Sequence, residues 1–229
     1  MKFGKKILEA CELTQSTFKE DSWVGYKRLK KVLKTYELSP GAQQVDLRTS
    51  NEAKEFFSLL RKDLLKVSRE YLNKEKQLVQ HCLLLITSIQ NSVQGLPLLT
   101  SKVLEAHLKQ IAELHKDFLV LRNFAVLNYC GFTKILKEHD KVTGCRTKDK
   151  FLRNLVNKQP FVPHELVKKG AEILSDLFIQ VKQRNIPVDL QTCIMDFVIS
   201  STCTNIQEEL NRKTGAAVEP SEKKTKFLI

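Results

Sequence analysis

The chain has 229 residues, enough for one large domain or two small ones, and its formal net charge is +12 at pH 7. Eight glycines and six prolines are few, which favours helix over strand, and the longest apolar run, CLLLI, is too short to be a membrane-spanning helix. The charge surplus indicates an anionic partner such as nucleic acid, an acidic lipid surface or a phosphorylated small molecule, with solubility alone as the simpler alternative.

Apolar residues recur at spacings of three and four through most of the chain and predict helices. The first predicted helix covers residues 3–13, and the second runs over about 23–36. Residues 37–50 are expected to form a loop, with a Pro-Gly pair as the helix breaker. Thr49 and Glu52 then predict a capping box that opens the third helix.

Two long helices are predicted next, at about 51–92 and from 101 to the VTG at 142–144. The third helix has a heptad seam of apolar residues, namely Phe57, Leu60, Leu64, Val67, Tyr71, Leu78 and Leu85. Two long antiparallel helices need others to cover such a seam, so the sequence predicts an all-α, elongated helical bundle. Shorter helices are expected at about 147–157, 163–184 and 187–210, followed by a disordered tail at 212–229.

The cysteines form no CxxC pair and no zinc-ligand spacing; they are Cys11, Cys82, Cys130, Cys145, Cys193 and Cys203. We expect reduced thiols in a cytoplasmic protein, with the nucleus or the periphery of a membrane complex as alternatives. The charged, amphipathic start MKFGKKILEACEL does not indicate a signal peptide. No Gly-rich phosphate loop, nucleophile motif or carboxylate pair stands out, so we predict neither a catalytic residue, nor a metal site, nor a cofactor.

Two stretches concentrate basic residues, and the first of them contains no acidic residue. Residues 22–36 contain five basic residues and no acidic one, and Tyr26 and Lys30 are neighbours on one helix face that borders the apolar stripe. Lys134, Lys137 and Lys141 form a second stripe, which faces away from the apolar side of their helix. A solvated face explains either stripe alone, whereas two such clusters favour an anion site. Lysines suit a densely phosphorylated ligand, to which Tyr26 adds a hydroxyl donor.

Four blocks of sequence resemble the SPX domain family in their order and spacing: MKFGKKI at the start, YKRLKKVLK at 26–34, GFTKILKEHDKVTG at 131–144 and NKQPF at 157–161. Together they frame residues 1–185, which we interpret as the SPX domain, followed by an additional helix at 186–211 that packs on the bundle or docks a partner. The resemblance implies an N-terminal helical hairpin packed against the two long helices. It also implies a sensor of inositol polyphosphates, with inositol pyrophosphates as the signal of cellular phosphate status.

The resemblance further implies which residues bind the ligand. Tyr26, Lys30 and Lys137 match the phosphate-binding cluster of the family, and Lys134 and Lys141 match an adjoining surface cluster. Lys2 matches the basic N-terminus of the family, which lies beside the ligand.

One residue departs from the family pattern. Glu138 stands where SPX domains usually carry a second lysine, and it lies within reach of the lysine stripe. We therefore expect Glu138 to neutralise part of the surface cluster and to alter affinity or ligand preference.

The leading hypothesis is a binding module without catalysis that binds inositol hexakisphosphate or an inositol pyrophosphate and relays phosphate status to a protein partner. The alternative is a non-catalytic regulatory subunit of a phosphate transport or polyphosphate-synthesis complex. General binding to nucleic acid or acidic membranes is a third reading, which steep salt dependence without ligand preference would support. We expect no nucleic-acid partner, because aromatic residues interleaved with the lysines are few.

Overall fold

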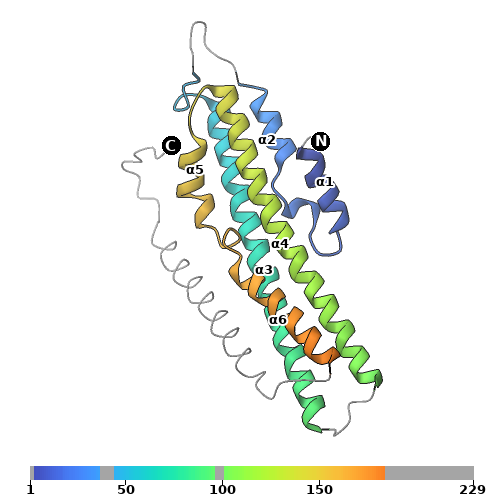
Figure 1. The fold of residues 1–229 in the computed structure, drawn as a ribbon. Helices are drawn as coiled ribbons and strands as arrows, with labels where there is room; N and C mark the ends of the chain where they lie inside the picture. Colours follow the sequence, from blue (N-terminus) through green and yellow to red (C-terminus); the bar gives the residue numbers. More distant parts are fainter. Residues whose placement is uncertain (1–2, 37–43, 96–100, 184–229) are drawn as a thin grey trace. The chain divides into compact units, whose positions relative to one another are not determined.

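The structure, a computed structural model of residues 1–229, describes residues 3–36, 44–95 and 101–183. Every regular element in these ranges is helical (Figure 1). In chain order they are α1 (Phe3–Leu13), the 3₁₀ turn η1 (Glu20–Ser22), α2 (Tyr26–Leu33), α3 (Asn51–Gly95), α4 (Ser101–Thr143), α5 (Lys148–Asn154), the 3₁₀ turn η2 (Val156–Lys158) and α6 (Glu165–Lys182). The predicted all-helical fold with an N-terminal hairpin and two long helices is confirmed. The expected helix at 186–211 and tail at 212–229 lie outside the described residues.

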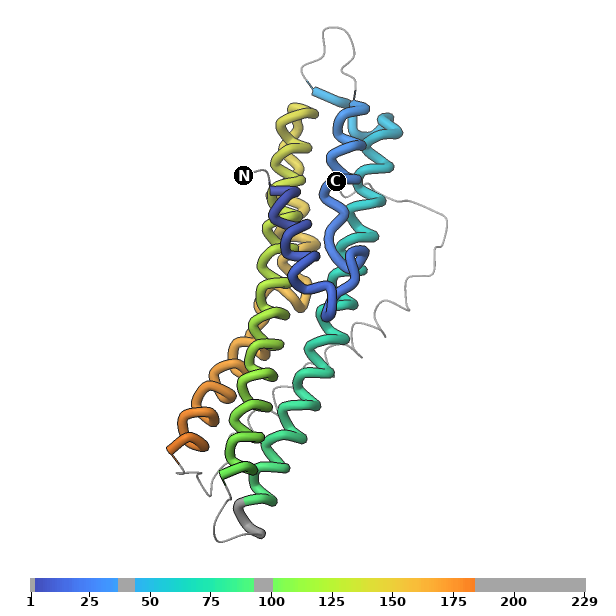
Figure 2. Tube along the Cα trace, turned by 90° about the vertical axis from the view of Figure 1, so that its right-hand side faces the viewer, coloured from blue at the N-terminus to red at the C-terminus, as the bar shows by residue number. Residues whose placement is uncertain are grey.

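The described residues divide into two compact units. The first contains those of Met1–Asn73 and Asn123–His164, and the second those of Lys74–Arg122 and Glu165–Leu228. Each unit therefore receives one part of α3 and one part of α4, which run side by side in opposite directions (Figures 1 and 2).

In the first unit, α1 lies beside the C-terminal part of α4 (Figure 2), and Val24, just before α2, comes close to the same part of α4. Both helices are amphipathic: Ile7 and Cys11 of α1 are buried, as are Leu29 and Val32 of α2. Gly131 of α4 permits this close approach, because a Cβ there would lie 2.6 Å from Cγ1 of Val24. The hairpin is thus held by burial of its apolar stripes, which leaves the lysines on its outer side exposed.

Helix α2 is shorter than predicted, because its expected first residues have another role. Trp23 and Val24 precede the helix, with Trp23 in an extended conformation. The Trp23 ring is buried and packs edge-on against Phe124, with 4.8 Å between ring centroids, and Phe18 stacks on Phe124 at 4.1 Å. An aromatic cluster, rather than another helical turn, thus connects the hairpin to α4.

The predicted capping box of Thr49 and Glu52 is wrong by one residue. The Oγ atom of Ser50 accepts a hydrogen bond from the N–H of Ala53 at 3.0 Å and donates one to the Glu52 carboxylate at 2.8 Å. Thr49 instead donates to the side chain of Asp46 at 2.9 Å. Serine and threonine are equivalent in the capping pattern, so the preceding turn decides between them.

The C-terminal end of α4 is fixed by a glycine and by buried polar contacts. Gly144 adopts a φ of 71° directly after the helix, and its N–H donates to the carbonyl of Asp140 at 3.0 Å, the usual way for a helix to end at glycine. The predicted end of α4 is therefore confirmed.

In the second unit, α6 packs against the first part of α4. Gly170 lies so close to the ring of Phe118 that any larger side chain would clash with it.

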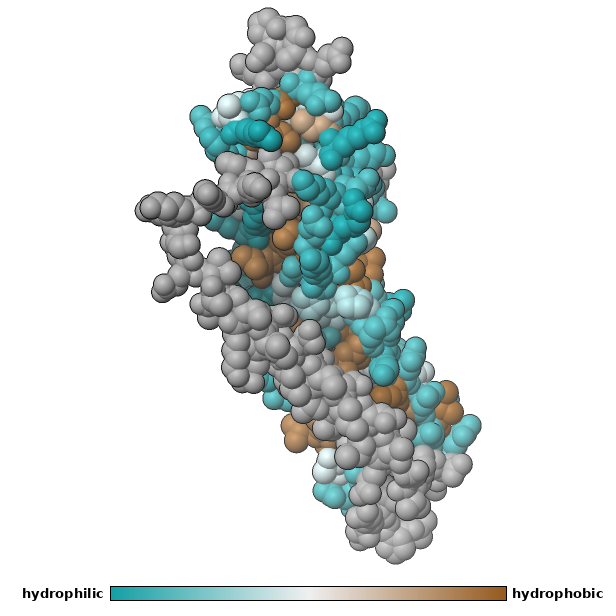
Figure 3. All heavy atoms as spheres, turned by 90° about the vertical axis from the view of Figure 1, so that its left-hand side faces the viewer, coloured by the Kyte–Doolittle hydropathy of each residue, from teal (hydrophilic) through white to brown (hydrophobic). Residues whose placement is uncertain are grey.

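The predicted heptad seam is largely confirmed along α3, since its members are buried except for Phe57, which is half-buried. On the face drawn in Figure 3, hydrophilic side chains cover much of the described helices, with hydrophobic residues between them. The four cysteines within the described ranges form no disulfide with one another, and Cys193 and Cys203 lie outside these ranges.

Candidate ligand-binding site

The start of α2 is held in place by two buried side chains from the long helices. The N–H of Val24 donates to Oδ1 of Asn128 at 2.9 Å, and the N–H of Gly25 donates to Oδ2 of Asp63 at 2.8 Å. Asn128 is oriented in turn by its own Nδ2, which donates to the carbonyl of Phe124 at 2.8 Å. These bonds satisfy backbone donors that no intrahelical acceptor can reach, and so they fix where α2 begins.

Asp63 also pairs with two cations. Its Oδ1 accepts hydrogen bonds from Arg28 at 2.8 Å and from Lys66 at 3.1 Å. The side chain of Asp63 is only 2% exposed, whereas that of Arg28 is 54% exposed. Arg28 is thus neutralised within the protein, unlike the lysines that share its helix.

Those lysines line an open groove of about 790 Å³ in the first unit, between α1, α2 and the C-terminal part of α4. We call it the basic groove. It is lined by Phe3, Gly4, Lys5, Leu8, Tyr26, Lys27, Lys30, Lys31, Lys34, Lys134, Lys137 and Glu138. Seven of these twelve residues are lysines and one is acidic, so the groove has a strongly positive potential.

The lysines of the basic groove are exposed and, except for Lys5, unpaired. Within the described part of the chain, Lys5 contacts Glu9 at 3.7 Å, and the other lysines of the groove make no ion pair with an acidic side chain. Lys134 lies over the ring of Phe3, with its Nζ 5.3 Å from the ring centroid. The positive charge is therefore available to a ligand from solvent.

Tyr26 forms one wall of the groove at the first residue of α2. It is 9% exposed, and its ring lies edge-on to Phe3 and 3.4 Å from the position of a Cβ on Gly4. Burial raises the pKa of Tyr26, and the nearby carboxylate of Glu138 raises it further. The phenol therefore keeps its proton at neutral pH and can donate a hydrogen bond.

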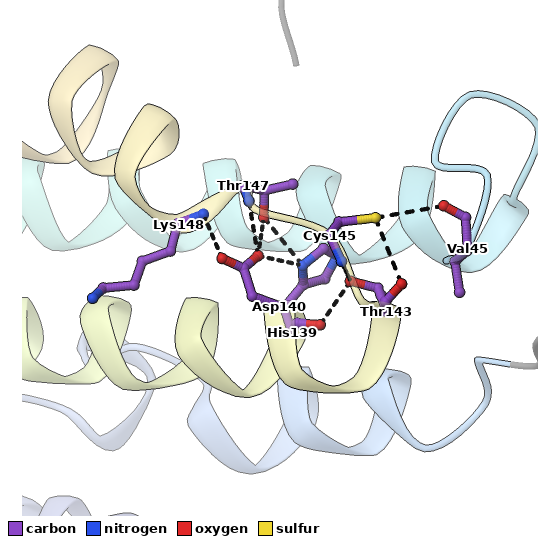
Figure 4. A network of polar contacts seen from close by, with 7 residues as sticks. All are labelled: Val45, His139, Asp140, Thr143, Cys145, Thr147 and Lys148. Atoms are coloured by element: carbon purple, nitrogen blue, oxygen red, sulfur yellow. Dashed lines mark hydrogen bonds and ion pairs between the residues drawn. The ribbon is translucent and has the colours of Figure 1, made fainter. Parts of the chain in front are cut away.

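A polar network secures the end of α4 that carries the groove lysines (Figure 4). The Asp140 carboxylate accepts hydrogen bonds from the hydroxyl of Thr147 at 2.6 Å, the N–H of Thr147 at 2.9 Å and the N–H of Lys148 at 3.0 Å. Burial would raise the pKa of Asp140, but these bonds together outweigh it and lower the pKa. His139, fully buried, adds a contact from Nδ1 to the Thr147 hydroxyl at 3.2 Å.

The structure brings most of the predicted ligand-binding residues together. Tyr26, Lys30, Lys134 and Lys137 all line the basic groove. Lys141 is exposed on α4 but is not among the lining residues, and Lys2 lies outside the described residues.

Sequence reasoning missed four lysines of the groove. Lys27, Lys31 and Lys34 were counted among the basic residues of 22–36 but were not assigned to the site, yet they line the same groove as Lys30. Lys5 was not singled out at all, because only the packing of α1 beside α2 brings it there. The absence of acidic residues in 22–36 was the available signal for the first three.

The described residues offer no other obvious chemical centre. No group of three or more His, Cys, Asp or Glu side chains among them is placed to hold a metal ion. Nor does any helix in these ranges have the length and apolar composition to cross a membrane. The arrangement is suited to binding a multivalent anion.

Comparison with known proteins points to one family. A model of the SPX domain matches residues 99–155. SPX domain-containing protein 2 of Arabidopsis thaliana is 26% identical over 205 residues, which cover 81% of this chain and 69% of that protein. SPX domain-containing protein 1 of Arabidopsis thaliana is 27% identical over 190 residues, covering 78% of this chain and 72% of that protein.

A solved structure agrees. The SPX domain of Chaetomium thermophilum glycerophosphodiester phosphodiesterase 1, in complex with inositol hexakisphosphate, superposes with a TM-score of 0.65 at 26% identity. The match covers 79% of this chain and 98% of that domain.

Proposed function

We propose that this chain is a member of the SPX domain family, which its family-model match, its curated relatives and a solved structure all support, and that its basic groove binds an inositol polyphosphate, either inositol hexakisphosphate or an inositol pyrophosphate. The observation that carries the proposal is the groove itself, in which seven lysines and a protonated phenol surround one open volume. A similar SPX domain has been solved with inositol hexakisphosphate, which supports the choice of ligand. We also propose that the SPX domain of this chain covers residues 1–185.

Individual residues have distinct proposed roles. Lys30 and Lys137 contact phosphate groups from two sides, while Tyr26 donates its hydroxyl between them. Lys134 and Lys141 extend the positive surface along α4, and Lys2 adds a cation from the N-terminus. Each charge-assisted hydrogen bond contributes about 1.5–3 kcal/mol, so removal of one contacting lysine weakens binding roughly tenfold or more.

Calorimetric titration with inositol hexakisphosphate tests the site. We expect Lys30→Ala and Lys137→Ala each to lower affinity roughly tenfold. Lys62→Ala is the matched control, since Lys62 is an exposed lysine of α3 outside the groove and the substitution changes net charge equally. Equal affinity of the Lys30 and Lys137 variants and the control would refute the site assignment.

A comparison of ligands tests the class. Inorganic phosphate, inositol hexakisphosphate, a pyrophosphorylated inositol and duplex DNA are titrated at two salt concentrations. We expect tight binding only of the two inositol ligands, because a single phosphate engages too few lysines at once. Binding of DNA with equal strength and a steep loss in salt would instead indicate a general polyanion surface.

We also propose that the ligand-bound groove presents a surface to a protein partner and so relays phosphate status. The groove is open, so a bound polyphosphate keeps some of its own charge exposed to a second protein. Affinity purification with and without inositol hexakisphosphate tests this role. A partner retained equally without ligand would favour the alternative, a regulatory subunit of a phosphate transport or polyphosphate-synthesis complex.

A further inference from the structure

Glu138 is the one acidic side chain among the described residues that line the basic groove. It lies on α4 directly after Lys137, with Lys134 one helical turn before it and Lys141 three residues after it. A carboxylate in such surroundings is attracted to several cations, yet it makes no ion pair with any of them within the described ranges. Glu138 is half-buried rather than free in solvent.

The negative charge of Glu138 affects another side chain that lines the groove. Burial is the first cause that raises the pKa of Tyr26, and the carboxylate of Glu138, which lines the same groove, is the second. The carboxylate therefore shares the volume that a ligand would occupy with the phenol of Tyr26 and the ammonium groups of the lysines.

A carboxylate and a lysine select opposite groups on a ligand. The carboxylate only accepts hydrogen bonds, so it repels a phosphate placed against it and binds a hydroxyl, which donates. The lysines that surround it favour phosphates at every other position of the ligand. A groove that combines the two distinguishes ligands by the placement of one hydroxyl, both by attraction and by repulsion.

We propose that Glu138 makes the basic groove selective for an inositol polyphosphate that retains one free hydroxyl facing α4, in preference to the fully phosphorylated ring. The inference rests on the proposed function: the ligand remains an inositol polyphosphate, and a ring with one free hydroxyl is ranked above the hexakisphosphate. The hydroxyl of the ligand donates to the Glu138 carboxylate, while the phosphates of the same ring contact Lys30 and Lys137.

The test is a titration of the full chain with inositol hexakisphosphate and with a panel of inositol pentakisphosphates, each lacking a different phosphate. We expect at least one pentakisphosphate to bind as tightly as the hexakisphosphate or more tightly, although it carries less charge. In Glu138→Gln, affinity for the hexakisphosphate rises by at least about threefold, and that pentakisphosphate loses its advantage. Glu138→Lys enlarges the effect and makes the hexakisphosphate the preferred ligand.

Glu55→Gln serves as the control, because Glu55 is an exposed glutamate of α3 outside the groove and the substitution changes net charge identically. Circular dichroism melts confirm that each variant is folded. Glu138→Gln variants that bind all ligands more tightly by one common factor, or that do not differ from the control, overturn the selectivity while leaving the proposed function intact. A wild-type chain that binds no inositol phosphate overturns the proposed function and, with it, this inference.

Discussion

Replacing Asp63 by alanine should release the hairpin from the long helices. The carboxylate is 2% exposed and accepts hydrogen bonds from the N–H of Gly25 at 2.8 Å, from Arg28 at 2.8 Å and from Lys66 at 3.1 Å. Breaking a buried pair costs about 3–5 kcal/mol when the remaining charge is stranded. Here Arg28 and Lys66 are 54% and 33% exposed and stay hydrated, which reduces that penalty.

The remaining cost is the unpaired N–H of Gly25 and the lost charge-assisted bonds, so we expect a loss of about 2–3 kcal/mol in the free energy of unfolding. Urea denaturation followed by circular dichroism measures it; with a slope of about 2 kcal/mol per molar, the midpoint falls by about 1–1.5 M. Asp63→Asn keeps an acceptor for Gly25 and should lose less. Asp149→Ala, at an 85% exposed aspartate, should change little. A midpoint for Asp63→Ala equal to that of Asp149→Ala would refute the anchoring role.

Three further predictions concern the residues that support the groove. Gly131→Ala places a Cβ 2.6 Å from Cγ1 of Val24, so thermal melts should show a loss of about 1–3 kcal/mol, whereas Gly4→Ala, with 3.4 Å to the Tyr26 ring, should be tolerated. Asn128→Ala leaves the buried N–H of Val24 without its acceptor and should cost about 1–3 kcal/mol in urea denaturation; an unchanged midpoint would contradict the role of this bond. The pKa of Asp140 is lower in the folded chain than its ordinary value of 3.8, so its stabilisation is fully present above that value and is lost as the pH falls below it. Melting temperatures from neutral pH to about pH 3 should therefore fall less in Asp140→Asn than in the wild type, and identical pH profiles would count against the network.

The helices could be predicted from the sequence because their apolar periodicity is strong and local. The bounds of α4 follow from its apolar pattern and from the glycine that ends it. The start of α2 did not follow, because Trp23 has the helical spacing of an apolar residue but packs in a cluster with Phe124, about a hundred positions away along the chain. Local pattern carries no information about such a distant partner.

Some residues of the candidate site could likewise be predicted from the sequence, and others could not. The lysines of α2 and α4 were visible as runs of uncompensated charge, and the structure places members of both runs around one groove. The roles of Asp63 and Asn128 could not be predicted, because in the sequence each is a single polar residue on a long helix. Only the folded structure places their oxygens where the backbone N–H groups of the hairpin donate to them. Lys5 was missed for the same reason, since its place depends on how α1 packs.

Polar residues outside the groove explain how so many lysines can share it before a ligand binds. The lysines of the hairpin and those of α4 repel each other. Without other interactions between these elements, that repulsion would push the hairpin away from α4. The anchors are not among the residues that line the groove: Asp63 and Asn128 hold the start of α2, and Asp140 holds the end of α4. The anchors bond to other groups of the chain rather than to the groove lysines, so they hold those lysines in place, and we expect a polyphosphate to relieve the repulsion when it binds. Affinity for a polyphosphate should then depend on the anchors as well as on the lysines, although no anchor lines the groove.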